Sequence, residues 1–384
     1  MNITYILSMI SILSPKAIGE DAKSIIDIHC HIAGIGAGNS GCFISDGLRK
    51  SWKYKIYLRA FGVTEDELLK QGDGLVVKRL SENLSKSRSV DKAVVLAMDG
   101  VVDDTGQLDK SKTEIYIPNE FVAAEVQHYN NLLYGASINP YRKDALELLD
   151  KAAADGAVLI KWIPSIQNID PADPRLIPFY DRLKALGVPL LTHTGSERSF
   201  TKNRDELADP ERLRLPLSRG VTVIAAHAAS GGRSHGERNF DRLLRLCREY
   251  PNLYADISAL TQINRLGHLS RALRQRELQD RLVYGSDMPL INMIIVTPFA
   301  FPFRISLAKM FEISRIDNPW DRDIAIKKEL GVPDKLLRRS GSLLQHYQKR
   351  EDEHTESQLI KPSRGELDSC NEERICHANC AYLY

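Results

Sequence analysis

The chain has 384 residues, of which 43% are hydrophobic and 27% charged, and this composition excludes a protein that is disordered throughout. Its 52 Lys and Arg residues nearly balance 50 Asp and Glu residues, so the formal net charge of +2 gives no electrostatic reason to expect nucleic acid or an acidic membrane as partner. A small molecule is the better expectation. The length allows several domains, although a single α/β barrel also fills about 250 residues or more.

The N-terminus carries an apolar run, Ile3–Leu13, followed by small residues. A signal peptide also has a positively charged start, and here no Lys or Arg precedes Lys16. We therefore expect residues 1–24 to form an N-terminal extension of a cytoplasmic protein, with export as the alternative. No stretch reaches the roughly 18 consecutive apolar residues of a membrane span. Six cysteines are too few for a fold of this size that depends on disulfides.

Short β-branched runs alternate with longer helical patterns along the chain, which is typical of βαβ units around a parallel sheet. Most of the runs are almost continuously apolar, as in strands that are covered on both faces. The predicted strands are Ile25–His29, Lys92–Met98, Leu132–Ile138, Ala157–Ile163, Val188–His193, Val221–His227, Asn252–Ser258 and Arg281–Asp287. Helices are expected between them, among others at Asp144–Ala154, Arg175–Leu186, Asn239–Tyr250 and Arg265–Leu278.

Eight strands with intervening helices predict a (β/α)8 TIM barrel over residues 25–347. A doubly wound open sheet is the alternative, because periodicity does not report whether a sheet closes. Long insertions follow the first strand and the eighth strand, the latter at Pro289–Asp323, and we expect them to form walls or a lid of the active site. Residues 348–384 have no sustained apolar period and are expected to form a polar, poorly ordered tail.

Four strand ends carry residues that can bind a metal ion. His29 and His31 end the first strand and share a face, because side chains alternate along a strand. His193, His227 and Asp287 end the fifth, sixth and eighth strands, and each is followed by small or turn-forming residues. The carboxyl ends of the strands meet at one mouth of a barrel, so these side chains are expected to converge there. If His29 and His31 were the only such residues, two ordinary buried histidines without a metal would explain them equally well.

With these motifs the sequence resembles the amidohydrolase superfamily, and most closely its amidohydrolase-related branch of TIM-barrel metal-dependent hydrolases and decarboxylases. The resemblance covers roughly residues 25–345 and rests on DIHCH, IKWIP with IDPADPR, LLTHTG, VIAAH and YGSDMP, in this order. It implies that His29, His31, His193 and Asp287 hold one divalent metal ion, most often zinc.

The resemblance leaves the number of ions open, and Lys161 is the residue that decides it. In family members with two metals, a lysine at the end of the fourth strand is carboxylated and bridges the ions. In members with one metal the lysine stays cationic and could pair with a substrate carboxylate, and one ion is favoured here. His227 would then either complete a second metal site or act as acid and base beside the first.

The chemistry of such a centre follows from charge. A bound divalent ion lowers the pKa of its water to about 7, so hydroxide forms near neutral pH. Asp287 could accept that proton and pass it to the leaving group, while His227 could polarise the carbonyl or donate a proton. Arg198, Arg233 and His235 lie in loops after the fifth and sixth strands and predict an anionic substrate, since guanidinium groups bind carboxylates well. A solvated cationic loop is the alternative.

Three further motifs carry less weight. Gly36–Gly41 fits G-x-G-x-x-G, but no helix opens after it, so we expect a flexible loop and no dinucleotide site. Gly232–Gly236 fits G-x-S-x-G, but four residues separate it from the preceding strand, whereas a nucleophile elbow needs the strand to run into the serine. The Cys and His residues of Cys370–Cys380 could bind zinc, but the tail offers little else to fold around them.

We therefore predict a barrel enzyme that hydrolyses an amide, ester or lactone bond of a small, carboxylate-bearing substrate with metal-activated water. Non-oxidative decarboxylation, a lyase reaction, is the alternative, because the same ligands serve both reactions. A barrel that binds a ligand without catalysis is more distant, since no member of the ligand set is missing. The expected partner is a small molecule, without nucleic acid, and assembly into a homo-oligomer stays open.

Overall fold

The computed structural model describes residues 24–197, 199–200 and 203–344. The predicted N-terminal extension and the predicted polar tail lie outside the described residues, apart from residue 24, and so do Arg198 and the Cys370–Cys380 cluster. Among the described residues, every helix is too short or too polar to cross a membrane.

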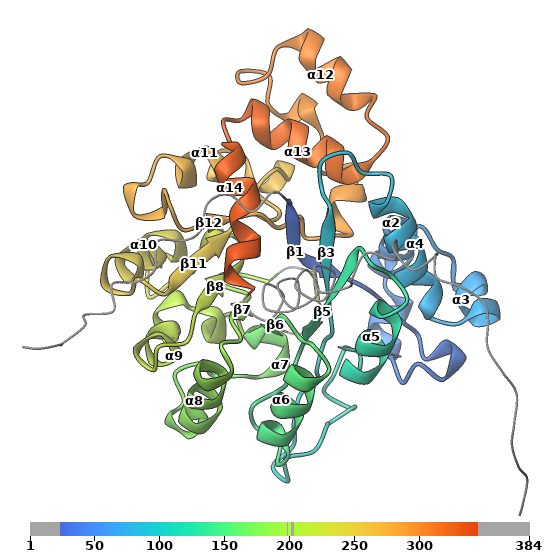
Figure 1. Cartoon of the computed structure of the whole chain (residues 1–384), viewed down its shortest axis with the longest axis vertical. Helices are drawn as coiled ribbons and strands as arrows, with labels where there is room; N and C mark the ends of the chain where they lie inside the picture. The colour runs from blue at the N-terminus through green and yellow to red at the C-terminus, as the bar shows by residue number, and fades with distance from the viewer. Residues whose placement is uncertain (1–23, 198, 201–202, 345–384) are drawn as a thin grey trace, which may run out of the picture. The chain divides into compact units, whose positions relative to one another are not determined.

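Eight parallel strands form one sheet, in the order in which they follow one another along the chain (Figure 1). Each strand lies within, or within two residues of, one of the eight predicted runs, which confirms the strand prediction. The strands are β1 (Ile26–His31), β3 (Lys92–Leu96), β5 (Leu132–Ala136), β6 (Leu159–Trp162), β7 (Leu190–Thr192), β8 (Val223–Ala225), β11 (Leu253–Asp256) and β12 (Leu282–Val283).

The sheet closes between its last segment and its first strand. The main-chain N–H of Asp287 donates to the carbonyl of His29 at 3.0 Å, and the N–H of His31 donates to the carbonyl of Met288 at 2.9 Å. Cys30 and Met288 form a parallel bridge. The protein is therefore a (β/α)8 TIM barrel, as predicted, and the open sheet is excluded.

Helices surround the ring of strands in Figure 1. Three of the four predicted helices are observed within two residues of their expected ends, as α6, α8 and α10. The helices are α1 (Asp46–Lys50), α2 (Trp52–Phe61), α3 (Glu65–Gln71), α4 (Gly74–Leu84), α5 (Asn119–Val126), α6 (Ala145–Ala154), α7 (Pro164–Gln167), α8 (Ile177–Leu186), α9 (Arg214–Ser218), α10 (Asn239–Glu249), α11 (His268–Leu273), α12 (Leu307–Ser314), α13 (Pro319–Glu329) and α14 (Asp334–Arg338). Two small antiparallel ribbons pair β2 (Phe43–Ile44) with β4 (Ile115–Tyr116) and β9 (Arg233–Ser234) with β10 (Glu237–Arg238).

The predicted helix Arg265–Leu278 is wrong in its extent. Only the six residues of α11 are α-helical, and Gly267 directly before them has a φ of 80°. This left-handed conformation, which glycine adopts without a steric penalty, separates Arg265 from the helix. Arg265 therefore lies outside the helix, at the end of a 3-10 turn, Ile263–Arg265, and Arg276–Leu278 forms a separate 3-10 turn.

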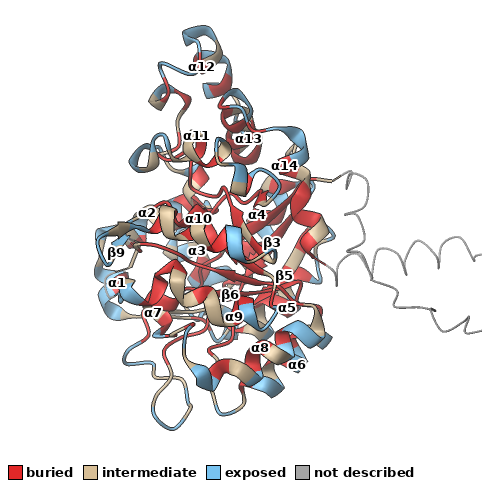
Figure 2. Ribbon diagram, turned by 90° about the vertical axis from the view of Figure 1, so that its left-hand side faces the viewer, coloured by how far each residue is buried: buried red, intermediate tan, exposed pale blue. Residues whose placement is uncertain are grey.

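Two apolar clusters lie on the two faces of the barrel wall, and Figure 2 shows the strands and the inner helix faces as buried. The larger cluster fills the space between strands and helices. The smaller cluster fills the interior of the barrel, where Leu343 and Leu344 at the end of the described chain join it. The other members of this interior cluster are Ile26, Ile28, Val94, Leu96, Val158, Leu159, Leu191, Ile224, Ala226 and Val283.

A β-bulge in β1 decides which of its side chains face the interior. The register against β3 shifts by one residue between Asp27 and Cys30. Asp27 pairs with Ala93, which belongs to the outer cluster, whereas His31 pairs with Leu96 of the interior cluster. Asp27 therefore points outward, although strict alternation would place it on the same face as His31.

Candidate metal centre

Donor atoms of His29, His31 and Asp287 face one another at the carboxyl end of the barrel. The Nε2 atoms of His29 and His31 are 3.2 Å apart, and Oδ1 of Asp287 lies 3.6 Å from the first and 3.7 Å from the second. In a tetrahedral zinc site with bonds of about 2.1 Å, neighbouring ligand atoms are about 3.4 Å apart. The three atoms therefore fit one face of such a coordination sphere.

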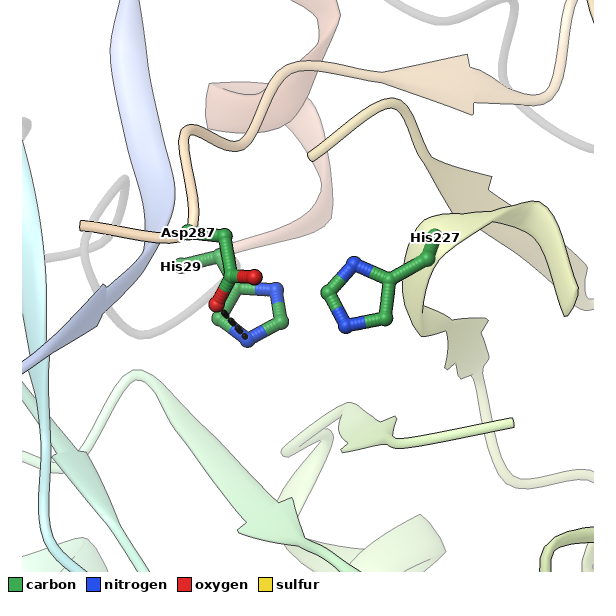
Figure 3. Close-up of side chains that lie close together, drawn as sticks. All are labelled: His29, His227 and Asp287. Atoms are coloured by element: carbon green, nitrogen blue, oxygen red, sulfur yellow. Dashed lines mark ion pairs between the residues drawn. The ribbon is translucent and has the colours of Figure 1, made fainter. Parts of the chain in front are cut away.

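His227 offers a nitrogen at the same place. One ligand atom from each of His29, His227 and Asp287 lies within 4.8 Å of the other two, and Figure 3 shows their side chains facing one another. The rings of His29 and His227 stack with their centroids 5.1 Å apart. His227 thus belongs to the same group of side chains and not to a separate site.

His193 follows β7 directly and lies beside His227. Its ring centroid lies 5.1 Å from that of His227, and its Nδ1 lies 3.4 Å from Oε2 of Glu197. The Nε2 atom of His193 is buried and has no hydrogen-bond partner among the described residues. A buried nitrogen without a partner is costly, and a metal ion would satisfy it.

Asp256 and Ser258, which sequence reasoning did not single out, orient two of the imidazoles. Oδ2 of Asp256 accepts a hydrogen bond from Nδ1 of His29 at 2.7 Å. The hydroxyl of Ser258 donates to Asp256 and lies 3.1 Å from Nδ1 of His29 and 2.8 Å from Nδ1 of His227. Both Nδ1 atoms therefore carry the proton, and both Nε2 atoms are left as acceptors or ligands. The signal in the sequence was an acid and a hydroxyl at the end of the run NLYADIS.

Burial governs the protonation of the group. Desolvation lowers the pKa of His29, His31 and His227 well below the ordinary histidine value, so these rings are neutral at pH 7. Desolvation also raises the pKa of Asp287 to about 7, because a carboxylate is poorly solvated there. Neutral imidazoles are the form that binds metal ions.

Lys161 projects from β6 into the interior of the barrel. Its side chain is buried, and its Nζ lies 2.8 Å from Nε2 of His29. Burial lowers the pKa of this amine to about 8, although the charges of Asp256 and Asp287 oppose the shift. Lys161 therefore lies beside His29 at the centre.

Two of the residues at the centre adopt a strained backbone conformation. The φ angles of His227 and Asp287 are 56° and 65°, in the left-handed region that residues with a side chain rarely adopt. Such conformations cost about 1–3 kcal/mol each and persist where the surroundings impose them. Here Asp256 accepts the main-chain N–H of His227 at 2.7 Å, and Asp27 accepts that of Ser286 at 2.9 Å.

The group opens into a cavity of about 330 Å³, a volume at the lower end of the range for small-molecule sites. Both insertions contribute to its wall, as predicted from their positions at strand ends. Tyr54, Leu58 and Phe61 of α2 come from the insertion after β1, and Pro289 and Leu290 come from the loop after β12.

The arginine and histidine predicted to bind substrate in the loop after β8 do not line this cavity. Arg233 is exposed in the ribbon of β9 and β10, where its Nη1 donates to the carbonyl of Gly236 at 2.9 Å, and His235 is exposed at the turn. Among the described residues, the arginine that lines the cavity is Arg265, from the segment after β11, and Lys161 lines it as well. The only signal for it in the sequence was its place shortly after a strand end.

The two glycine motifs have no role at the centre. Gly36–Gly41 contains a 3-10 turn, Ala37–Asn39, and the main-chain N–H groups of Ile35, directly before it, and of Gly36 donate to the buried carboxylate of Asp73. Gly232–Gly236 forms part of the ribbon of β9 and β10, so its serine does not sit on a strand-to-helix elbow.

Comparisons with known proteins agree with this architecture. A solved TIM-barrel protein from Bordetella bronchiseptica is 16% identical, with a TM-score of 0.52, and the match covers 86% of this chain and 99% of that one. A probable 2-pyrone-4,6-dicarboxylic acid hydrolase from Acinetobacter baumannii is 12% identical, with a TM-score of 0.46 and coverages of 85% and 98%. A 5-carboxyvanillate decarboxylase from Sphingomonas paucimobilis is 11% identical, with a TM-score of 0.46 and coverages of 85% and 99%.

At 16% identity the likeness to the Bordetella bronchiseptica protein shows the fold alone. The comparison with curated proteins gives no match. The family model described as Amidohydrolase matches residues 26–303, which is more than half of the chain. The chain therefore belongs to the amidohydrolase family.

Proposed function

We propose that this protein is a metal-dependent hydrolase that cleaves an amide, ester or lactone bond of a small, carboxylate-bearing substrate. The observation that carries the proposal is the triangle of donor atoms from His29, His31 and Asp287, with sides of 3.2 to 3.7 Å, at the edge of a cavity. Membership of the amidohydrolase family supports the same conclusion.

One divalent ion would be held by His29, His31, His193 and Asp287. Three imidazoles and a carboxylate are donors that zinc takes, and the unpartnered Nε2 of His193 fits this assignment. An ion bound there would lower the pKa of a water molecule to about 7 and supply hydroxide as the nucleophile.

Asp287 and His227 are the proposed proton carriers. Asp287 would accept the proton of the attacking water and release it again. His227 has its Nδ1 beside Ser258 and presents Nε2 as an acceptor, so it would take a proton before it donates one. The proton then passes to the leaving group.

Lys161 bears on the number of ions. Its Nζ and an ion would both approach Nε2 of His29, and two cations exclude each other at that distance. We favour a single ion with Lys161 turned toward the substrate. A carboxylated Lys161 that bridges two ions predicts a carbon dioxide adduct, which mass spectrometry of the native protein would detect.

Metal analysis combined with isotope labelling tests the proposed function. We expect about one zinc per chain, loss of hydrolysis after chelation, recovery on adding zinc, and ¹⁸O from labelled water in the product. His29→Ala should lose the metal, whereas His128→Ala, at an exposed histidine outside the cavity, should keep it. Release of carbon dioxide without ¹⁸O in the product would contradict hydrolysis and indicate decarboxylation.

A further inference from the structure

One side of the cavity is built from hydrogen-bond donors and contains no acid. The segment 257–281, which connects β11 to β12, has five arginines, and its two acids, Glu277 and Asp280, lie outside the cavity lining. Gln262, Asn264, Arg265 and His268 of this segment line the cavity. This side of the cavity therefore has a positive potential.

Arg265 brings its charge to the metal centre itself. Its Nη1 donates to the hydroxyl of Ser230, which also lines the cavity. Burial is the largest cause of the lowered pKa of His227, and the charge of Arg265 is the next largest. The same charge also counteracts the rise that burial causes in the pKa of Asp287. The guanidinium thus lies within electrostatic reach of both proposed proton carriers.

Gln262 adds a donor that the protein itself does not satisfy. Its side chain is 3% exposed, and its Nε2 has no hydrogen-bond partner among the described residues. The buried Nδ1 of His268 has none either. A buried polar group that is left without a partner costs about 1–3 kcal/mol, so an acceptor oxygen of a ligand would stabilise this side of the cavity.

Another part of the cavity wall is largely apolar. Leu58 and Phe61 of α2 line it, together with Phe200. A ligand in the cavity therefore meets both hydrogen-bond donors and hydrocarbon.

We propose that Arg265 and Gln262 form a carboxylate subsite, and that the substrate is a small organic anion whose apolar body packs against α2. The subsite is distinct from the point of bond cleavage at Asp287 and His227. This inference rests on the proposed function, since it concerns the substrate of the same site.

Calorimetric binding to the zinc-loaded protein tests the subsite. The probes are aryl and alkyl carboxylates, such as phenylacetate, each compared with its neutral amide, such as phenylacetamide. We expect carboxylates to bind more tightly than their amides. Arg265→Gln should weaken carboxylate binding roughly ten-fold and leave amide binding unchanged, because a charge-assisted hydrogen bond is lost. Gln262→Leu should act in the same direction by a smaller factor.

Arg233→Gln is the matched control, because it removes an exposed guanidinium outside the cavity and should change neither affinity. Arg265→Lys keeps the charge and should fall between the wild type and Arg265→Gln. The inference is wrong if no carboxylate binds better than its amide, or if Arg265→Gln weakens both equally. Zinc content in the same samples separates the two proposals: zinc-loaded protein without carboxylate preference refutes the subsite alone, whereas wild-type protein without zinc refutes the proposed function.

Discussion

A single carboxylate, that of Asp256, governs which nitrogens face the proposed ion. Its Oδ2 accepts a hydrogen bond from Nδ1 of His29, and its Oδ1 accepts the main-chain N–H of His227. A hydrogen bond at Nδ1 sets the ring orientation and makes Nε2 a stronger ligand. Asp256 is therefore a positioning residue for both histidines.

Asp256→Asn should weaken zinc binding by about ten- to a hundred-fold, because a neutral amide holds the His29 ring less firmly than a carboxylate does. Competition with a chromogenic chelator measures this affinity. Asp280→Asn removes a carboxylate that is 73% exposed and should leave the affinity unchanged. Wild-type affinity in Asp256→Asn would show that the carboxylate does not position the ligand.

Lys161 predicts a pH dependence of the metal-free protein. Burial lowers the pKa of this amine to about 8 from its ordinary value of 10.5. Between these values the unfolded chain holds a proton that the folded chain has lost, so the free energy of unfolding rises with pH across this window. The rise is at most about 1.4 kcal/mol per pH unit.

Lys161→Met removes this dependence. The stability of the wild type relative to the variant should therefore increase from about pH 8 to pH 10.5, measured by urea unfolding in the presence of a chelator. Lys151→Met removes an exposed lysine and should follow the wild type across the whole window. Parallel curves for wild type and Lys161→Met would refute the lowered pKa.

Among the elements, α13 supports the strand ends that carry the centre. The indole Nε1 of Trp320 donates to Oδ2 of Asp27 at 2.8 Å, and Oδ1 of Asp27 accepts the main-chain N–H of Ser286 at 2.9 Å. Nζ of Lys327 donates to the carbonyl of Gly285 at 3.3 Å. The helix thus holds β1 and the segment before Asp287 together from outside the barrel.

Trp320→Phe deletes the indole donor and leaves the buried carboxylate of Asp27 with one partner fewer. The free energy of unfolding should fall by about 1–3 kcal/mol, and zinc affinity should fall with it. Urea unfolding and chelator competition measure the two effects. Trp52→Phe, at an indole that is 72% exposed, is the control and should change neither. A destabilised Trp320→Phe with unchanged zinc affinity would limit α13 to a structural role.

At the scale of the whole molecule, the interior of the barrel depends on residues from the end of the described chain. Leu344 is fully buried in the interior cluster with Ile26, Ile28 and Val283. Interior packing of this kind holds strands from both ends of the chain together. The closure of the sheet is thus stabilised by a segment remote from most of the strands in sequence.

Leu344→Ala should lower the free energy of unfolding by about 2–5 kcal/mol, because it removes buried hydrocarbon and leaves a cavity among packed side chains. Chemical denaturation followed by circular dichroism measures the change. Leu307→Ala, at a side chain that is 64% exposed, should cost far less. Equal losses in the two variants would show that Leu344 does not fill the interior.

The strand ends illustrate how far the sequence leads to the site. Apolar runs ending in His193, His227 or Asp287 report a buried strand and a polar group at its carboxyl end, and both are local properties of the chain. Their convergence follows once the barrel is assumed, because parallel strands share one carboxyl edge. Asp256 was missed because an acid at a strand end has no visible partner until His29 lies beside it.

The amino-acid sequence by itself determined the eight strands, their parallel arrangement and the motifs at the strand ends. Burial on both faces makes each strand a short, almost continuously apolar run, which can be recognised without the fold. Only the tertiary structure decided that Asp27 points outward, that Arg265 and not Arg233 lines the cavity, and that Asp256 holds His29. Each of these depends on a bulge, a left-handed glycine or a contact between distant segments. The physical reason is that such features arise from the packing of one element on another, which no single stretch of residues records.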